Sequence, residues 1–142
     1  MRISNRTCIA ILALFGVFAV ASGMSLALVG WHLLAGLMVL CISFALFAGG
    51  WIGGGDAKLV TVLSVWIGFS QLWDYIAISS VLGGFLTLAI LVMRSHPLPA
   101  FAARQPWIQR LHDKKSGVPY GIALGVTALI MWPHGSFWAS VI

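Results

Sequence analysis

Long uncharged stretches of apolar residues dominate the chain, and short charged or proline-rich segments separate them. No Asp, Glu, Lys or Arg occurs between Arg6 and Asp56, a stretch that is too long for one membrane crossing of roughly 20 residues and suits two. Gly30-Trp31-His32 interrupts this stretch with an aromatic and a polar ring, as is typical of a membrane interface. The pattern predicts helices over residues 8–29 and 32–51.

The second half of the chain continues in the same way. A charged turn at Asp56 and Lys58, then Asp74, then a basic and proline-containing segment over 94–117 separate further apolar stretches. We expect the 94–117 segment to be a surface loop. The apolar stretches predict three more helices, over 57–72, 75–93 and 118–133.

Composition agrees with a membrane protein. Of the 142 residues, 61% are apolar and only 8% are charged, whereas a soluble domain has about a quarter of its residues charged. We therefore predict an all-α, polytopic integral membrane bundle of about five transmembrane helices, forming one domain over 1–142. A separate soluble enzyme domain is excluded, because five crossings use the whole length.

The net charge of +5 is explained by orientation in the membrane, so we expect no nucleic-acid partner. Five crossings place residues 2–6, 52–58 and 94–117 on one side of the bilayer. That side carries all eight Lys and Arg residues and should be cytoplasmic by the positive-inside rule. A cleaved signal peptide is an alternative interpretation of the first segment, because Arg2 and Arg6 precede an apolar core and the small residues Ala19 and Ala21.

The chain has only three acidic residues, and a carboxylate at a membrane boundary is a candidate for function. Asp56 follows three glycines, which permit a close approach of a substrate backbone. The equally open alternative is a glycine turn with Asp56 as a helix cap. Asp74 should lie at the opposite membrane face, and Asp113 is flanked by lysines in what we expect to be a solvated loop.

Other chemistry has little support. The four histidines, His32, His96, His112 and His134, show no metal-ligand spacing on one helix, so we predict no metal. Cys8 and Cys41 lie in apolar stretches and should act as small hydrophobic residues. Glycines recur every fourth residue at Gly117, Gly121 and Gly125, a spacing that favours close helix packing.

Four segments resemble one protein family. Gly53-Gly54-Gly55-Asp56-Ala57-Lys58-Leu59 is similar to the Gly-x-Gly-Asp motif of the type IV prepilin peptidases, which are membrane aspartic proteases. Arg2-Ile3-Ser4-Asn5, Gly30-Trp31-His32 and the final-helix entry over 115–123 resemble further segments of its short branch, associated with Flp-type tight-adherence pili. Four segments in the family's order are a specific signal, whereas Gly-x-Gly-Asp alone is shared with presenilin-like proteases.

The resemblance implies an endopeptidase that cleaves the leader of a prepilin or pseudopilin at the cytoplasmic face of the bacterial inner membrane. Asp56 would be one of two catalytic aspartates, supported by Gly53, Gly55 and Lys58 of the motif. No metal or organic cofactor is implied. The expected partners are the prepilin substrate and the lipid bilayer.

The sequence departs from the family pattern at its start. The family's other aspartate precedes the Arg-Ile-Ser-Asn segment at the end of an earlier helix, and both are missing before Arg2. The chain therefore resembles helices two to six of a six-helix fold, and we expect the DNA upstream to encode the missing helix. The alternative is an inactive, truncated relative that acts as a membrane scaffold or pilus assembly partner.

Overall fold

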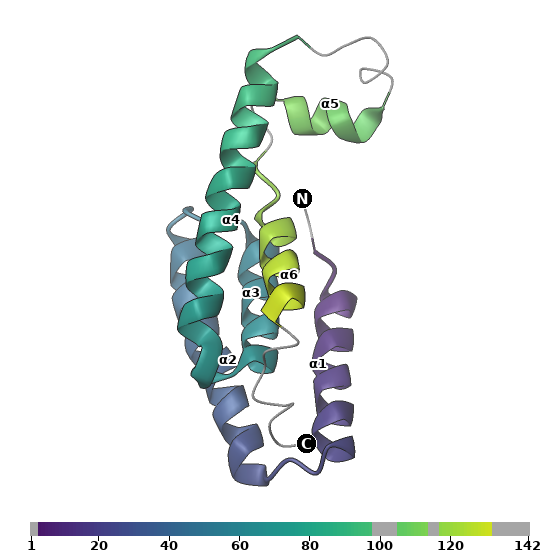
Figure 1. Ribbon diagram of the computed structural model, residues 1–142, viewed down its shortest axis with the longest axis vertical. Coiled ribbons are helices and arrows are strands. Elements are labelled where there is room, and N and C mark those ends of the chain that lie inside the picture. Colours follow the sequence, from purple (N-terminus) through teal and green to yellow (C-terminus); the bar gives the residue numbers. More distant parts are fainter. Residues whose placement is uncertain (1–2, 98–104, 114–116, 132–142) are drawn as a thin grey trace.

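The computed structural model describes residues 3–97, 105–113 and 117–131, and every regular element in these ranges is an α-helix. In chain order the helices are α1 (Asn5–Ala21), α2 (Leu26–Ala48), α3 (Gly54–Ile67), α4 (Phe69–Ser95), α5 (Pro106–His112) and α6 (Tyr120–Met131). In Figure 1, α1 to α4 run along the long axis, α6 lies beside α3 and α4, and α5 lies across the end of α4. The all-helical prediction is thus confirmed for the described residues.

The first turn lies earlier in the chain than the sequence pattern predicted. We expected the break at Gly30-Trp31-His32, but α1 ends at Ala21 and α2 begins at Leu26. Gly23 adopts a φ of +66°, which suits glycine, and the Ser25 hydroxyl caps α2 by accepting from a backbone N–H at 3.2 Å. Local capping groups therefore set the turn, and the aromatic segment lies within α2.

The break between the third and fourth helices was also misplaced. A single residue, Gly68, separates α3 from α4 and has a φ of +69°, where a side chain would be strained. Asp74, which we expected in the turn, therefore lies in the second turn of α4 and is exposed. The charge of Asp74 suggested a turn, but an exposed acidic residue can stand on the surface of a helix without ending it.

The segment over 94–117, predicted as a loop, contains the short helix α5. Pro106 stands at its start, where the missing N–H of proline has no cost. Arg94 Nε donates to the carbonyl of Leu111 at 2.8 Å and so joins α5 to the end of α4. The last helix, α6, ends at Met131, and residues 132–133 of the predicted helix lie outside the described residues.

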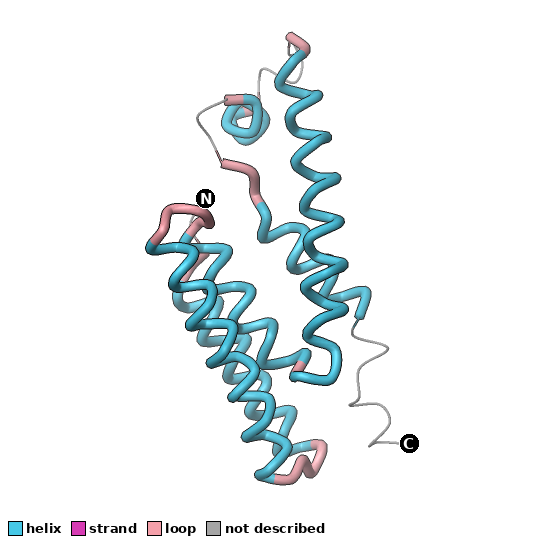
Figure 2. Tube along the Cα trace, turned by 90° about the vertical axis from the view of Figure 1, so that its left-hand side faces the viewer, coloured by secondary structure: helices cyan, strands magenta, loops and turns pink. Residues whose placement is uncertain are grey.

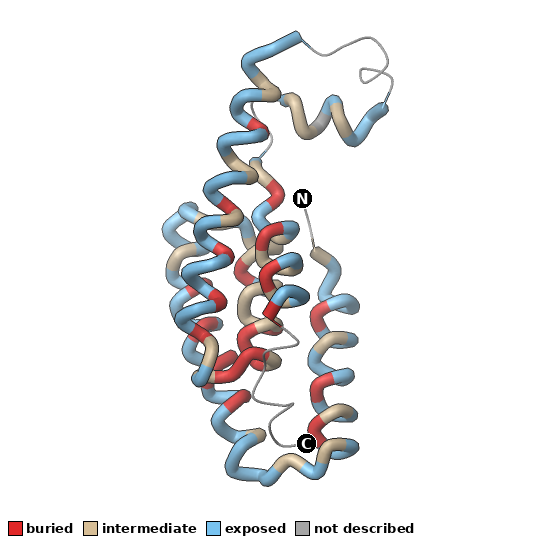
Figure 3. Tube along the Cα trace, viewed as in Figure 1, coloured by how far each residue is buried: buried red, intermediate tan, exposed pale blue. Residues whose placement is uncertain are grey.

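Figure 2 shows two groups of helices, α1 to α3 and α4 with α6, which diverge toward the end where α5 lies. They meet where the chain passes from α3 through Gly68 into α4. The buried side chains of Ile67, Tyr75 and Met131 form a core at this junction. In Figure 3 the buried positions cluster on the facing sides of the helices.

The first group is held together mainly by α3. A Cβ on Gly36 of α2 would overlap the Val65 side chain, so the two helices approach closely. On the α1 side, Trp66 Nε1 donates to the carbonyl of Ile11 at 3.0 Å, and the Trp66 and Phe15 rings lie 5.6 Å apart. Close small-residue packing and an aromatic contact with a satisfied N–H thus fix α3 between its neighbours.

The outer surface of the described helices is largely apolar, with exposed leucine, valine and isoleucine side chains along α1, α2, α4 and α6. Helices α2 and α4 are long and apolar enough to cross a membrane, whereas α1 and α6 are apolar but shorter. Apolar surface of this extent fits a protein surrounded by lipid. The number of five crossings stays a prediction.

Helix directions bring residues 3–6, 49–58 and 117–119 to one end, which we call the Asp56 end. Arg6 and Lys58 lie there, and Arg94 lies beyond it on α4. This grouping agrees with the predicted placement of the basic residues on one side. Arg110 belongs to α5. The other four basic residues lie outside the described residues: Arg2, Arg104, Lys114 and Lys115.

Candidate functional site

Asp56 lies in the first turn of α3, and its carboxylate turns back over the start of that helix. The N-cap position belongs to Gly53, and no side chain caps the helix there. A Cβ on Gly53 would stand 3.2 Å from Asp56 Oδ2, which is closer than side chains normally pack. The glycine therefore leaves room for the carboxylate, and Asp56 is not the N-cap residue of its own helix.

The carboxylate instead interacts with another helix, α6. Gly121 donates its backbone N–H to Asp56, and a Cβ on Gly121 would stand 3.4 Å from Asp56 Oδ1. The first N–H groups of a helix have no partner within it, and a negative charge near them is favourable. Asp56 thus connects the start of α3 to the start of α6.

Gly121 is the site residue to which the sequence analysis gave no chemical role. We assigned Gly117, Gly121 and Gly125 together to helix packing, but they are not equivalent. A Cβ on Gly117 or Gly125 would meet nothing within 4 Å, whereas one on Gly121 would contact Asp56, Leu59 and Ile3. No signal in the sequence separates Gly121 from Gly117, because both lie in the segment over 115–123 that resembles the family's final-helix entry.

Burial raises the pKa of Asp56 above its ordinary value of 3.8, and the hydrogen bond from the Gly121 N–H opposes part of that rise. Asp56 lies outside the two helices that are long enough to span a bilayer. A carboxyl group with a raised pKa keeps its proton to higher pH than an exposed aspartate. This property suits a group that exchanges protons during catalysis.

The other motif residues have structural contacts around the same helix start. Lys58 Nζ donates to Asn5 Oδ1 at 2.9 Å, and both side chains are exposed, so Lys58 joins α3 to α1. A Cβ on Gly54 would come within 3.0 Å of the Phe47 ring, so Gly54 lets the end of α2 pack on α3. Gly55 is half-buried in the same turn, and its predicted role in admitting a substrate backbone stays a prediction.

Asp56 borders a cavity of about 1110 Å³ between the two groups of helices. Its walls are mostly apolar side chains of α2, α3, α4 and α6, and Ile3 and Trp51 stand at the Asp56 end. The hydroxyl groups of Ser43, Ser79 and Ser80 are among the few polar groups that line it. A single carboxylate therefore stands beside a large apolar space.

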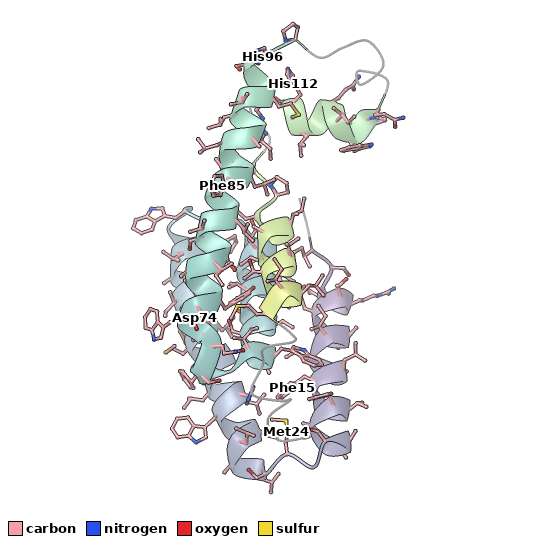
Figure 4. The ribbon with its side chains drawn as sticks, in the orientation of Figure 1. Phe15, Met24, Asp74, Phe85, His96 and His112 are labelled. Carbon is pink, nitrogen blue, oxygen red and sulfur yellow. The ribbon has the colours of Figure 1, made fainter. Side chains whose placement is uncertain are left out.

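The other two aspartates lie elsewhere. Asp74 is on the part of α4 farthest from α5, and Figure 4 labels it there. It is exposed in the second turn of α4 and is not among the described residues that line the cavity beside Asp56. Asp113 is exposed at the C-cap of α5, and α5 lies beyond the ends of α3 and α6 in Figures 1 and 2.

The remaining candidates have structural surroundings. His32 is buried, and its Nδ1 lies 2.8 Å from the carbonyl oxygen of Val65. Cys8 is buried and Cys41 is exposed, and both are free thiols. Across the described ranges no three His, Cys, Asp or Glu residues gather as a metal site would require, and His134 lies outside those ranges.

The sequence model of the type IV leader peptidase family matches residues 1–88, which is more than half of the chain. The chain therefore belongs to this family, as the resemblance predicted. The matched residues include Asp56 and its glycines, whereas Gly121 lies outside the match. No curated protein and no solved structure matches the chain.

Proposed function

We propose that this chain is a membrane aspartic endopeptidase that removes the leader of Flp-type prepilins at the cytoplasmic face of the bacterial inner membrane. The observation that supports this proposal best is the half-buried Asp56 carboxylate at the edge of the apolar cavity. A titratable group with a raised pKa beside a concave apolar surface is a reasonable basis for an active site.

The cavity fits the substrate that the family implies. A prepilin is cleaved just before the apolar helix of the mature pilin, so the peptide at the site must pass from water into lipid. The cavity has apolar walls on α2 and α4 and borders Asp56 at one end. An apolar segment held there would present the preceding peptide bond to the carboxylate.

The reaction requires two carboxyl groups. One carboxylate accepts a proton from the attacking water, whose oxygen bonds to the scissile carbonyl carbon, while the other carboxyl donates its proton to the carbonyl oxygen. The C–N bond then breaks, and the leaving amine takes up a proton. Two carboxyl groups that share one proton near neutral pH meet these needs, because both cannot ionise readily at close range.

Asp56 supplies one carboxyl group, and we propose that a segment joined before Arg2 supplies the other. Ile3 lines the cavity, and Asn5 accepts a hydrogen bond from Lys58. A chain that enters α1 here must pass close to Asp56. Neither Asp74 nor Asp113 is well placed for this role, because Asp74 is exposed on α4 and Asp113 is exposed at the C-cap of α5.

The second candidate function is that of a scaffold without turnover. The hydrogen bond from Gly121 favours it, because a carboxylate that links α3 to α6 would be retained for structure alone. The two functions differ in what Asp56→Asn does. An amide oxygen still accepts the hydrogen bond, but an amide cannot exchange the protons that hydrolysis requires.

The test is cleavage of a Flp-type prepilin that is co-expressed with the chain, followed as a shift in electrophoretic mobility. A fusion of the chain to a preceding aspartate-bearing helix should cleave the prepilin. Asp56→Asn in the fusion should abolish cleavage, and the matched variant Asp74→Asn should not. Cleavage by the Asp56→Asn variant at the rate of the parent fusion would overturn the proposal, and no cleavage by any fusion would favour the scaffold.

A further inference from the structure

We infer that Tyr120, packed against Gly83 of α4, is a positioning residue that holds the start of α6 where Gly121 meets Asp56. The inference rests on the proposed role of Asp56, and it adds α4 to the groups that set the geometry of the site. It is supported by contacts on both faces of the same helix turn.

The first contact is between the Tyr120 ring and the backbone of α4. A Cβ on Gly83 would stand 3.1 Å from both Cδ1 and Cε1 of Tyr120, which is tighter than nearly all side-chain contacts. The ring therefore lies directly on the helix surface that Gly83 leaves bare. The next residue, Gly84, has nothing within 4 Å of the same position, so the contact is specific to Gly83.

The second contact fixes the hydroxyl end of the ring. Thr87 Oγ1 and the Tyr120 hydroxyl share a hydrogen bond of 3.0 Å. Thr87 lies one turn beyond Gly83 and also donates to the Gly83 carbonyl at 2.7 Å. The ring is thus held at its face and at its tip by one turn of α4.

A third contact prevents α6 from rotating about its own axis. Tyr75, which is fully buried, donates its hydroxyl to the carbonyl of Leu124 at 3.2 Å. Leu124 lies about one turn after Gly121, and Tyr120 immediately precedes Gly121. Side chains of α4 therefore hold α6 on both sides of the N–H that reaches Asp56.

This arrangement matters because Asp56 and Gly121 belong to different groups of helices, which diverge at this end (Figure 2). A hydrogen bond weakens steeply once its length or angle departs from the favourable range. A small shift of Tyr120 would move Gly121 by a similar amount. We therefore expect substitutions at Gly83 or Thr87 to alter the hydrogen bond of Asp56, although neither residue contacts it.

The chain offers a direct way to observe Asp56. Its only acidic residues are three aspartates, Asp56, Asp74 and Asp113, so protein labelled with ¹³C at the aspartate carboxyl carbon should give three signals. Asp56→Asn assigns the Asp56 signal by removing it. The titration midpoint of that signal in detergent-solubilised protein then reports the Gly121 hydrogen bond, while Asp74 and Asp113 serve as internal references.

Gly83→Ala should shift the Asp56 midpoint upward relative to wild type, because the hydrogen bond that favours the carboxylate is weakened. The matched variant Gly84→Ala should leave the midpoint unchanged. Thr87→Val and Tyr120→Phe should shift it in the same direction as Gly83→Ala, and Thr87→Ser, which keeps the hydroxyl, should restore the wild-type value. The signals of Asp74 and Asp113 should not move in any variant.

Equal Asp56 midpoints in Gly83→Ala and Gly84→Ala would overturn the inference. If Gly83→Ala does not fold, the Asp56 midpoints of Thr87→Val and Thr87→Ser are compared instead, because neither change adds bulk at the contact. Equal midpoints in these two variants would likewise overturn the inference. The readout needs no cleavage. The titration therefore tests the positioning role of Tyr120, whereas the prepilin assay tests the proposed function.

Discussion

The carboxylate of Asp56 on α3 accepts a hydrogen bond from the backbone N–H of Gly121, the second residue of α6. The same carboxylate therefore links α3 to α6 and, by our proposal, also exchanges protons during peptide-bond hydrolysis. Substitutions that keep one and remove the other can separate the two roles.

Asp56→Ala should destabilise the protein by about 1 kcal/mol, because it removes the acceptor for an N–H at a helix start. Asp56→Asn should cost no stability, since an amide oxygen can accept the same hydrogen bond and carries no charge to bury. Thermal unfolding in detergent, followed by circular dichroism, measures the difference. Equal destabilisation by both substitutions would show that the negative charge, and not an acceptor, is what α6 requires.

Stability should also depend on pH through Asp56. Its native pKa lies above the ordinary value of 3.8, so between these two values the native state binds more protons than the unfolded state. The free energy of unfolding should therefore fall as pH rises through that window. Below 3.8 the carboxyl is protonated in both states and this unfavourable contribution is absent.

The measurement is the unfolding temperature of wild type minus that of Asp56→Asn, from pH 3 to pH 7. Taking the difference removes the contributions of Asp74 and Asp113, which both proteins share. We expect wild type to lose stability relative to the variant as pH rises just above 3.8. A difference that grows in favour of wild type with rising pH would mean that the Gly121 hydrogen bond outweighs burial.

Two glycines at positive φ form a matched pair. Gly68 and Gly23 have φ values of +69° and +66°, so alanine at either position carries a similar backbone strain of roughly 1–2 kcal/mol. Only at Gly68 would the new Cβ also meet the ring of His32, at 2.6 Å. Gly68→Ala should therefore destabilise the protein clearly more than Gly23→Ala in the same thermal assay.

The pair also tests the packing of His32. If both alanine variants lose equal stability, the His32 ring moves aside at no cost. In a His32→Ala background, Gly68→Ala should otherwise cost less stability than it does in wild type, because the obstructing ring is gone. Its cost there should match that of Gly23→Ala.

The positions of these two glycines explain why the sequence analysis misplaced two turns. Charge and aromatic character pointed to Gly30-Trp31-His32 and to Asp74, yet the chain turns at Gly23 and Gly68. Charges and interfacial rings indicate where a helix meets water, but they do not end it. A left-handed glycine ends it, and at the first turn the Ser25 cap begins the next helix; both are short-range signals that the long apolar pattern obscured.

The site was more accessible to sequence reasoning than the turns. Asp56 and its glycines were singled out from one short motif that resembles the family's Gly-x-Gly-Asp, whereas the residues alone left a helix cap equally open. Gly121 lies 65 residues away in the sequence, and no local pattern distinguishes it from Gly117 or Gly125. Its contact with Asp56 follows from how α6 packs on α3, which only the folded chain reveals.

The orientation of the bundle is the last prediction. In a background with Cys8 and Cys41 replaced by alanine, we would place single cysteines at Asp74 and Trp107, which are both exposed. They lie toward opposite ends of the chain's longest helix, since Asp74 is in the second turn of α4 and α5 is joined to its other end. A membrane-impermeant maleimide added to spheroplasts should label Asp74→Cys directly.

Trp107→Cys should be labelled only after the membrane is opened, because the basic residues near α5 favour the cytoplasmic side. This result would put Asp56 on the same side, where a newly made prepilin presents its leader. The reverse pattern, with Trp107→Cys labelled from outside, would place Asp56 at the outer face and contradict the proposed site of cleavage. Labelling of both cysteines from outside would mean that α4 does not cross the membrane, although it has the length and hydropathy to do so.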